Sequence, residues 1–315
     1  MKHVRHLMQS TGPYLAALGI LVLLRSTGLA QTLDLVVYDL ITSQRSEGSG
    51  QDQPITLVGI DESDIQRFGW PIDDGIFCDA FDELNAKGVT AIGFDIYRDQ
   101  GVGAEQQCLR DRFRGQPTLV SIFNVAAGIA AVPGTPIERQ SYNDLSLDAD
   151  GVVRRDLVHV TGQDEATVAF PLRVLEVATG DRSLRDALDA GTNPGPWLSA
   201  DGGGYHNEID AGLGLQRLLR FREPRSYATY TLGEVVDGAV PEDILRDRVV
   251  LIGSTAPSLR DLFEVPHTRF DRGESLFTIS GVEVHANRLA SLMDERSGSF
   301  QPGWLMPGWG NLLMV

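Results

Sequence analysis

The stretch that decides the fold reads PITLVGIDES over residues 54–63 and GVTAIGFDIYRD over residues 88–99. Each part contains a short continuous apolar run, over residues 55–60 and 90–94, and each run ends at an acidic residue. Continuous apolar runs are typical of strands that are covered on both faces of a sheet. We therefore predict two buried parallel strands, and with them an α/β fold in which helices flank a mostly parallel sheet.

The segment between the two runs has the pattern of a helix. Gly88 is expected to end this helix, because a residue without Cβ adopts the left-handed cap conformation easily. A strand, a helix and a parallel strand form a right-handed crossover, which brings both strand ends to one edge of the sheet. The helix is predicted from apolar side chains at spacings of three and four residues: Ile76, Phe77, Ala80, Phe81 and Leu84.

This opening resembles the start of the type-two CHASE domain, an extracytoplasmic sensory module. Three later stretches resemble the same family, and the resemblance extends from about residue 33 to residue 294. It implies a membrane-anchored sensor without catalytic activity, which binds a small ligand and controls a cytoplasmic nucleotide cyclase or protein kinase absent from this chain. The three stretches are DADGVVRR (148–155), VVLIGSTAPSLRDLF (249–263) and SGVEVHANRL (280–289).

The ends of the predicted strands supply the candidate ligand-binding residues. Residues 249–252 form a further apolar run, predicted as the last buried strand, and polar residues follow it. Because parallel strands end at the same edge, we expect a ligand site there. The candidates are Asp61, Glu62, Asp95, Ser254, Thr255, Arg260 and Asp261.

Two other functions remain open for the same residues. Asp61 and Asp95 could hold Mg²⁺ or act as acid and base, which would make the chain an exported metal-dependent hydrolase. The D-x-D spacing of haloacid dehalogenase phosphatases is absent, however, and Asp61 or Ser63 could simply cap a helix. A structural domain that oligomerises without a small ligand is the other alternative. We predict no catalytic residue, no metal and no cofactor, and we expect His285, alone on a predicted helix over 282–293, to be a scaffold residue.

The charge of the chain bears on its partners. With 27 basic and 43 acidic residues the formal net charge is −16. This charge argues against nucleic acid, because binding to phosphates needs a basic surface. The expected partners are the cell membrane, an unidentified small molecule and a second copy of the chain in a homodimer.

The N-terminal segment predicts the localisation. Basic residues precede an apolar run over residues 14–24, a pattern that keeps the N-terminus in the cytoplasm and exports the domain after the run. The run could be a signal peptide cleaved near Ala30, or a retained anchor in which Arg25 snorkels to the interface. The family resemblance implies the anchor.

The expected organisation therefore has three parts. Residues 1–32 form a cytoplasmic tip and a transmembrane helix, and residues 33–295 form the extracytoplasmic, periplasmic sensory domain. Residues 296–315 are rich in tryptophan and apolar residues, which predicts the start of a second membrane helix that is cut short. Within the sensory domain, residues 33–41 have helical apolar spacing and are either a signal-transmitting helix or a plain linker.

Two local features complete the predictions. Asp150 and Gly151 are expected to form a tight turn between strands, after which Arg154 and Arg155 are expected to be solvated. Cys78 is expected to be a small core residue, with a single bridge to Cys108 left open in an oxidising compartment.

Overall fold

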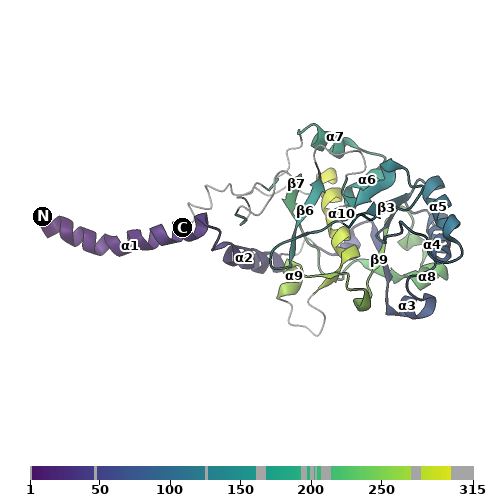
Figure 1. Cartoon of the computed structure of the whole chain (residues 1–315), viewed down its shortest axis with the longest axis horizontal. Coiled ribbons are helices and arrows are strands. Elements are labelled where there is room, and N and C mark those ends of the chain that lie inside the picture. The colour runs from purple at the N-terminus through teal and green to yellow at the C-terminus, as the bar shows by residue number, and fades with distance from the viewer. Residues whose placement is uncertain are drawn as a thin grey trace.

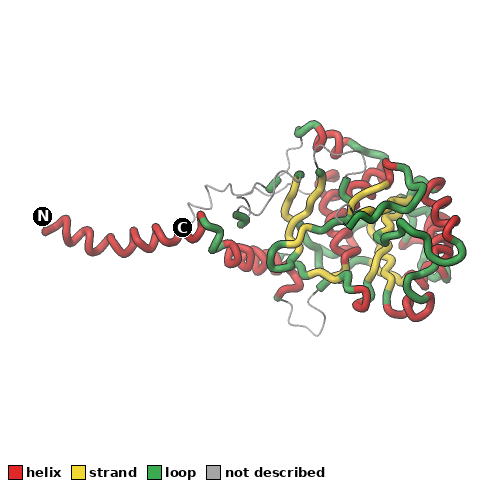
Figure 2. The backbone as a smooth tube through the Cα atoms, viewed as in Figure 1, coloured by secondary structure: helices red, strands yellow, loops and turns green. Residues whose placement is uncertain are grey.

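A six-stranded parallel sheet forms the centre of the protein (Figures 1 and 2). The computed structural model describes residues 2–45, 48–124, 127–160, 168–192, 197–198, 202, 204–206, 214–270 and 278–298. The strand order is β4-β3-β2-β9-β1-β8. The strands are β1 (Ile55–Ile60), β2 (Ala91–Phe94), β3 (Leu119–Phe123), β4 (Gln140–Tyr142), β8 (Ala228–Thr231) and β9 (Val249–Ser254).

Helices cover both faces of this sheet, which confirms the predicted α/β class. Alternate residues of each central strand face opposite layers: Leu57 packs with α6 and α10, whereas Val58 packs with α4 and α8. The first layer contains α6 (Phe170–Thr179) and α10 (Gly281–Ser297). The second contains α3 (Glu62–Phe68), α4 (Asp74–Ala86), α5 (Gln106–Gly115) and α8 (Leu232–Val236). The continuous apolar runs thus arise because both faces of each strand are buried.

Strand β9 lies between β1 and β2. It pairs in parallel with both neighbours, so that Val249 aligns with Ile55 on one side and with Ala91 on the other. The first two strands therefore share one sheet and end at the same edge, as predicted, but they are not neighbours. With about 4.8 Å between adjacent strands, β9 separates their ends by roughly 10 Å.

Smaller elements extend the body beyond the central sheet. Strands β5 (Ser146–Leu147), β6 (Val153–His159) and β7 (Leu215–Leu218) form an antiparallel sheet, and β10 (Leu262–Phe263) pairs with β11 (Ile279–Ser280). The turn predicted at Asp150 and Gly151 joins β5 to β6 and is confirmed. The remaining short helices are η1 (Gly50–Asp52), η2 (Ile137–Arg139), α7 (Ser183–Asp189), η4 (Glu242–Ile244), η5 (Pro257–Leu259) and α9 (Pro266–Arg269).

Two helices precede the body. Helix α1 (Lys2–Ser26) extends away from it, and α2 (Gln31–Ser43) lies against it beside α9 (Figure 1). The large apolar side chains of residues 14–24 are exposed. Among the described residues, no helix has both the length and the apolar character that crossing a membrane requires. The membrane helix predicted at the C-terminus begins at residue 296, and residues 299–315 lie outside the described part of the chain.

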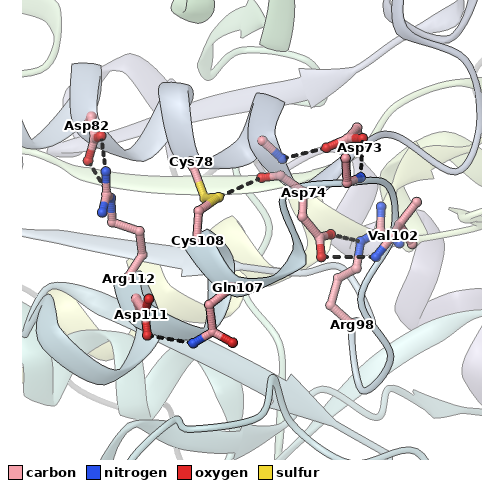
Figure 3. The surroundings of a disulfide bond; sticks show 12 residues. Asp73, Asp74, Cys78, Asp82, Arg98, Val102, Gln107, Cys108, Asp111 and Arg112 are labelled. Atoms are coloured by element: carbon pink, nitrogen blue, oxygen red, sulfur yellow. Dashed lines mark hydrogen bonds and ion pairs between the residues drawn. A yellow bond between two sulfur atoms is a disulfide. The ribbon is translucent and has the colours of Figure 1, made fainter.

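Cys78 and Cys108 form a disulfide (Figure 3). Cys78 is buried in α4, as expected of a core residue, but it is also bonded to Cys108 in α5. The packing of α4 against α5 brings the two Cα atoms to 6.4 Å. A separation of 30 residues carries no signal for pairing, and so the sequence left the bridge open. Disulfides persist in oxidising compartments, which agrees with an exported domain.

Removing this disulfide should destabilise the body. We expect the double substitution Cys78→Ala and Cys108→Ala to lower the free energy of unfolding by about 2–4 kcal/mol, because the bridge restricts the unfolded chain. Urea denaturation with and without dithiothreitol measures the effect. The reductant should destabilise the wild-type protein and leave the double variant unchanged; equal sensitivity of the two proteins would show that the bridge does not contribute.

Candidate functional site

A cavity of about 540 Å³ opens at the carboxyl edge of the central sheet. Asp95 follows β2, Asn124 follows β3, Asn143 follows β4 and Ser254 ends β9, so that the ends of four neighbouring strands line the cavity. Ligand sites of open α/β folds lie at this edge, beyond the carboxyl ends of the strands. Further residues come from the segment before β10, which carries Asp261, and from α10.

A chain of hydrogen bonds orients the carboxylate of Asp95. The Nδ2 group of Asn143 donates to Asp95 Oδ1 at 2.9 Å. The Tyr97 hydroxyl donates to Asn143 Oδ1 at 2.7 Å, and Asn124 Nδ2 donates to the Tyr97 hydroxyl at 3.0 Å. Asp95 is only 9 % exposed, and its position is therefore set by neighbours rather than by solvent.

His285 on α10 lies behind Asp95. Its Nε2 is 3.6 Å from Asp95 Oδ2, and the Arg288 guanidinium lies 3.0 Å from its Nδ1. A guanidinium can only donate, so Nδ1 accepts and the neutral ring carries its proton on Nε2, which faces Asp95. Burial, and then the charge of Arg288, lower the pKa of His285 well below 6.5. His285 is therefore neutral. It contacts Arg288 within α10, as expected of a scaffold residue, and it also lines the cavity.

The carboxylates of the cavity share an unusual electrostatic environment. Burial, reinforced by the negative charge of Asp261, raises the pKa of Asp95 to about 7. Burial also raises the pKa of Asp261 to about 6 and raises that of Asp144. Arg98 lines the same cavity, but its guanidinium is directed to Asp74 at 3.2 Å and donates to the Ile72 carbonyl. The carboxylates thus lack a facing cation among the described lining residues.

Ser254 belongs to the wall of the cavity, but its hydroxyl does not face Asp95. Gly253, the residue before it, faces Val282 on α10 and Asp95, and successive strand residues face opposite sides of the sheet. Ser254 is 6 % exposed, and its Oγ is buried without a hydrogen-bond partner within the described part of the chain.

The other predicted site residues have different surroundings. Asp61 caps α3, because its Oδ1 accepts from the backbone N–H groups of Ser63 and Asp64 at 2.8 and 3.0 Å. Glu62 accepts from the N–H of Ser258 at 2.9 Å. Thr255 packs over Gly59, where an added Cβ would lie 2.6 Å from its Oγ1, and Arg260 is exposed with a left-handed backbone, φ 57°.

The structure thus brings Asp95, Ser254 and Asp261 to one cavity and leaves Asp61, Glu62, Thr255 and Arg260 outside its lining. Asp61 and Glu62 are outside because β9 separates the end of β1 from the end of β2. Thr255 follows β9 but packs over Gly59 of β1. Sequence reasoning also missed several lining residues. Phe263 lies in the two-residue strand β10, and the others lie outside helices and strands, where no periodicity marks them: Trp70, Tyr97, Asn124, Asn143 and Asp144.

Comparison with known families assigns the chain. The family model of the CHASE2 domain matches residues 16–315. The chain belongs to the CHASE2 family. CHASE2 domains are extracytoplasmic sensory modules associated with cyclases and kinases, and they are typically not catalytic. Neither a curated protein nor a solved structure matches the chain.

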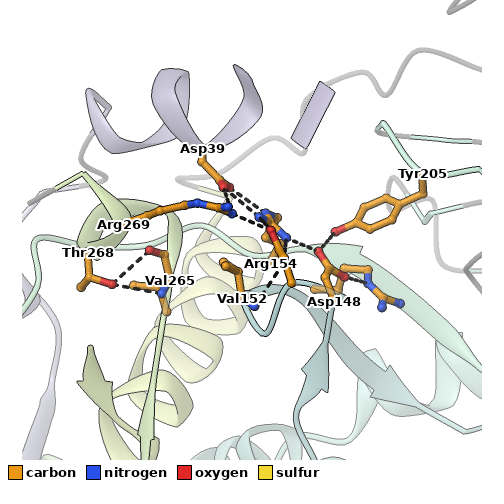
Figure 4. A network of polar contacts seen from close by, with 10 residues as sticks. Asp39, Asp148, Val152, Arg154, Tyr205, Val265, Thr268 and Arg269 are labelled. Carbon is orange, nitrogen blue, oxygen red and sulfur yellow. Dashed lines mark hydrogen bonds and ion pairs between the residues drawn. The ribbon is translucent and has the colours of Figure 1, made fainter. Parts of the chain in front are cut away.

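The CHASE2 domain has a second polar cluster, where α2 meets the body (Figure 4). Arg154 on β6 is fully buried, and its guanidinium forms two hydrogen bonds, of 2.7 and 2.8 Å, with both carboxylate oxygens of Asp39 on α2. It also donates to Asp148 and Asp150 at 2.7–2.8 Å. Arg269 on α9 donates to Asp39 as well, at 3.0 Å. We call Asp39, Asp148, Asp150, Arg154 and Arg269 the α2 cluster.

The prediction that Arg154 and Arg155 are solvated is wrong. Arg155 is also buried, and it donates to Asp148 at 2.8 Å and to Gln216 at 2.6 Å. The partner Asp39 is 115 residues from Arg154 in the chain, so that no local pattern could reveal the pairing. The helix predicted over residues 33–41 is present as part of α2, and this cluster ties it to the body of the CHASE2 domain.

A continuous set of polar contacts connects the cavity of the CHASE2 domain to β6. Arg288, which contacts His285, also donates through Nε to Asp156 Oδ1 at 2.6 Å. Asp156 lies two residues after Arg154 on β6, so that one strand carries the residue that contacts α10 and the residue that holds α2. The α10 helix therefore contacts the cavity at His285 and contacts, at Arg288, the strand that holds α2.

Proposed function

We propose that this CHASE2 domain senses a small molecule in the cavity and passes the signal through α2 to a cytoplasmic nucleotide cyclase or protein kinase. The observation that carries the proposal is a cavity at the strand ends in which a buried carboxylate, Asp95, is oriented by a hydrogen bond from Asn143. Its volume lies within the range of small-molecule sites, roughly 300–1,000 Å³.

The N-terminal helix supports a position at the membrane. The exposed apolar side chains of residues 14–24 are too numerous for a solvated helix surface, and basic residues precede them. We infer that α1 holds the domain at the cell membrane with its N-terminus in the cytoplasm. The domain itself would then lie in the periplasm, in agreement with its disulfide. The homodimer expected from the sequence stays a prediction.

Signal transmission requires two states of α2 or α10. A ligand shifts the equilibrium between them only by the difference in its affinity for the two states. Contact between ligand and Asp95 would act on His285, and through Arg288 and Asp156 on the strand that holds the α2 cluster. These contacts provide a physical route for coupling between the cavity and α2, and hydrogen exchange over residues 33–41 measures that coupling.

The geometry favours the sensor over the hydrolase. A hydrolase built on Asp61 and Asp95 needs both carboxylates in one site, whereas Asp61 caps α3 and is separated from Asp95 by β9. Within the described residues, no group of three or more histidine, cysteine or acidic side chains is placed to hold a metal ion.

The oxidation state of the cysteines in cells tests the localisation. Cells that produce the full chain are quenched with acid, and free thiols are then labelled with a maleimide polymer under denaturing conditions. We expect no label on the wild-type chain until a reductant is added, because an exported domain keeps Cys78 bonded to Cys108. The Cys78→Ala variant, in which Cys108 is free, should take one label and serves as the control. Two labels on unreduced wild-type protein would place the domain in a reducing compartment and contradict the sensory proposal.

A further inference from the structure

We propose that the outer face of α2 pairs in parallel with the same face of a second copy of this chain. The outer face consists of Leu33, Val37, Leu40 and Ile41, which lie on the side of α2 that points away from the body. This inference rests on the membrane anchor proposed for α1, and it assigns a surface to the expected homodimer.

The outer face is apolar and exposed, although the body holds the other side of the helix. Gln31, Leu35 and Asp39 are buried against the body, and Asp39 is hydrogen-bonded to Arg154. The four residues of the outer face are instead 46–69 % exposed. A helix at the surface of a soluble protein is normally polar on the side that faces solvent. An apolar outer side therefore indicates a surface that another molecule covers.

The spacing of the outer face indicates a parallel pair of helices. Leu33, Val37 and Leu40 are separated by four and then by three residues, which is the alternation of d and a positions in a coiled coil. Leucine at d combined with a β-branched residue such as valine at a favours a parallel dimer over larger assemblies. Ile41 lies beside this line of residues and widens the contact surface.

Charge also favours this face as the place where two copies meet. The structure describes α2 in full, and its exposed residues are Thr32 and the four residues of the outer face, all of them uncharged. Two chains that each carry a net charge of −16 repel each other. An uncharged apolar face is where this repulsion opposes contact least.

The direction of α2 argues against the lipid surface as the partner. Helices α1 and α2 follow one another along the long axis of the molecule, and α2 lies between α1 and the body (Figure 1). If α1 crosses the membrane, α2 extends away from the membrane and not along its surface. A cytoplasmic effector would lie on the opposite side of the membrane from α2, so it cannot cover the outer face either.

The membrane anchor compensates for the small size of the outer face. Residues 33–41 span only about 12 Å of helix, at 1.5 Å per residue. This length is less than a coiled coil needs to be stable by itself. Two copies anchored through α1 in one membrane are already parallel and at the same height, and their effective concentration is high. The α2 helices should therefore pair in the membrane.

Cysteine crosslinking of the full-length chain in isolated membranes tests the inference. Cys78 and Cys108 are bonded to each other, so a single introduced cysteine is the only free thiol. With copper phenanthroline, Val37→Cys and Leu40→Cys should each give a disulfide-linked dimer, because a two-fold axis places each residue of a parallel pair next to its own copy. We expect at least about tenfold more dimer than with Ala86→Cys, since a disulfide needs Cα atoms within about 7 Å. Ala86 is exposed at the end of α4 and serves as the control position.

A charge within the outer face should prevent the crosslink. Val37→Glu, combined with Leu40→Cys, places two carboxylates opposite each other in the dimer and should reduce the crosslinked product by about tenfold or more. Ala86→Glu, the same charge at an exposed position outside α2, should leave the Leu40→Cys crosslink unchanged. The substituted side chains are exposed, so the fold should be retained in every variant.

The outcomes separate this inference from the proposed function. A chain that sediments with membranes but gives no more dimer at positions 37 and 40 than at position 86 would overturn the α2 dimer and leave the anchor standing. A crosslink that Val37→Glu does not reduce would do the same. Quenching of a fluorophore on Val37→Cys by nitroxide-labelled lipids would assign the outer face to the lipid surface and overturn the dimer. A soluble chain that crosslinks at positions 37 and 40 would contradict the anchor and support the dimer, and a soluble chain without crosslinks would contradict both.

Discussion

Replacing Arg154 with methionine should lower the free energy of unfolding by about 3–5 kcal/mol. The substitution keeps an elongated apolar side chain but removes the guanidinium that lies between Asp39, Asp148 and Asp150. Asp39 and Asp148 are buried, and without Arg154 each keeps only one arginine, Arg269 and Arg155 respectively, to compensate its desolvation. Urea denaturation monitored by circular dichroism measures the change.

The Arg154 prediction has a matched control and a local readout. Arg67 forms a two-point ion pair with Asp237 at the surface, where both side chains are about half exposed, and Arg67→Met should leave the stability close to that of the wild type. Amide hydrogen exchange should accelerate over residues 33–41 in the Arg154 variant only, because Asp39 ties α2 to the body. Equal stability of the two variants would show that the α2 cluster does not hold the helix.

Asp95→Asn should change how stability depends on pH. The pKa of Asp95 is raised to about 7 in the folded protein, against 3.8 for an unperturbed aspartate, so that the folded state keeps a proton that the unfolded state has lost. Wild-type stability should therefore fall as pH rises from about 4 to about 7. One pKa unit corresponds to about 1.4 kcal/mol. The difference between 3.8 and about 7 therefore lowers the free energy of unfolding by as much as about 4 kcal/mol over this pH range.

The difference between two proteins isolates this effect. Asparagine can still accept the hydrogen bond from Asn143, but it does not ionise. The stability of Asp95→Asn relative to the wild type should thus increase between pH 4 and pH 7.5, as measured by urea denaturation at several pH values. As a control, Asp79→Asn removes a carboxylate at an exposed position of α4, and its stability should follow that of the wild type at every pH. A relative stability of Asp95→Asn that is independent of pH would mean that Asp95 ionises as a solvated carboxylate.

The two predictions concern opposite ends of one set of contacts. Asp95 is the cavity residue that contacts His285, and Arg154 is the residue that holds α2. If the proposed coupling exists, a small molecule that binds in the cavity should alter hydrogen exchange over residues 33–41 in the wild type. The same molecule should have no such effect in Asp95→Asn, which makes the coupling measurable without the cytoplasmic effector.

Local patterns in the sequence determined the elements of this protein. The apolar runs at residues 55–60 and 249–252 became buried strands, and the helical spacing between Ile76 and Leu84 became α4. Capping and turn residues also lie at the predicted positions: Asp61 caps the start of α3, and Gly151 lies in the turn before β6. Caps and turns depend on residues that are close in the sequence. The periodicity of apolar residues indicates which face of a helix or strand is buried.

Only the tertiary structure decided which of these residues meet. The insertion of β9 between β1 and β2 separated Asp61 from Asp95 and placed Gly253 of β9 beside Asp95 instead. The pairs Asp39–Arg154 and Asp95–His285 join segments more than a hundred residues apart. Periodicity predicts that a side chain faces inward, but it does not predict which other side chain it contacts. The contacting side chain depends on the order of the strands and on the packing of the helices. The sequence therefore determined the layers and the edge at which a ligand site could form, and the packing of those layers decided its residues.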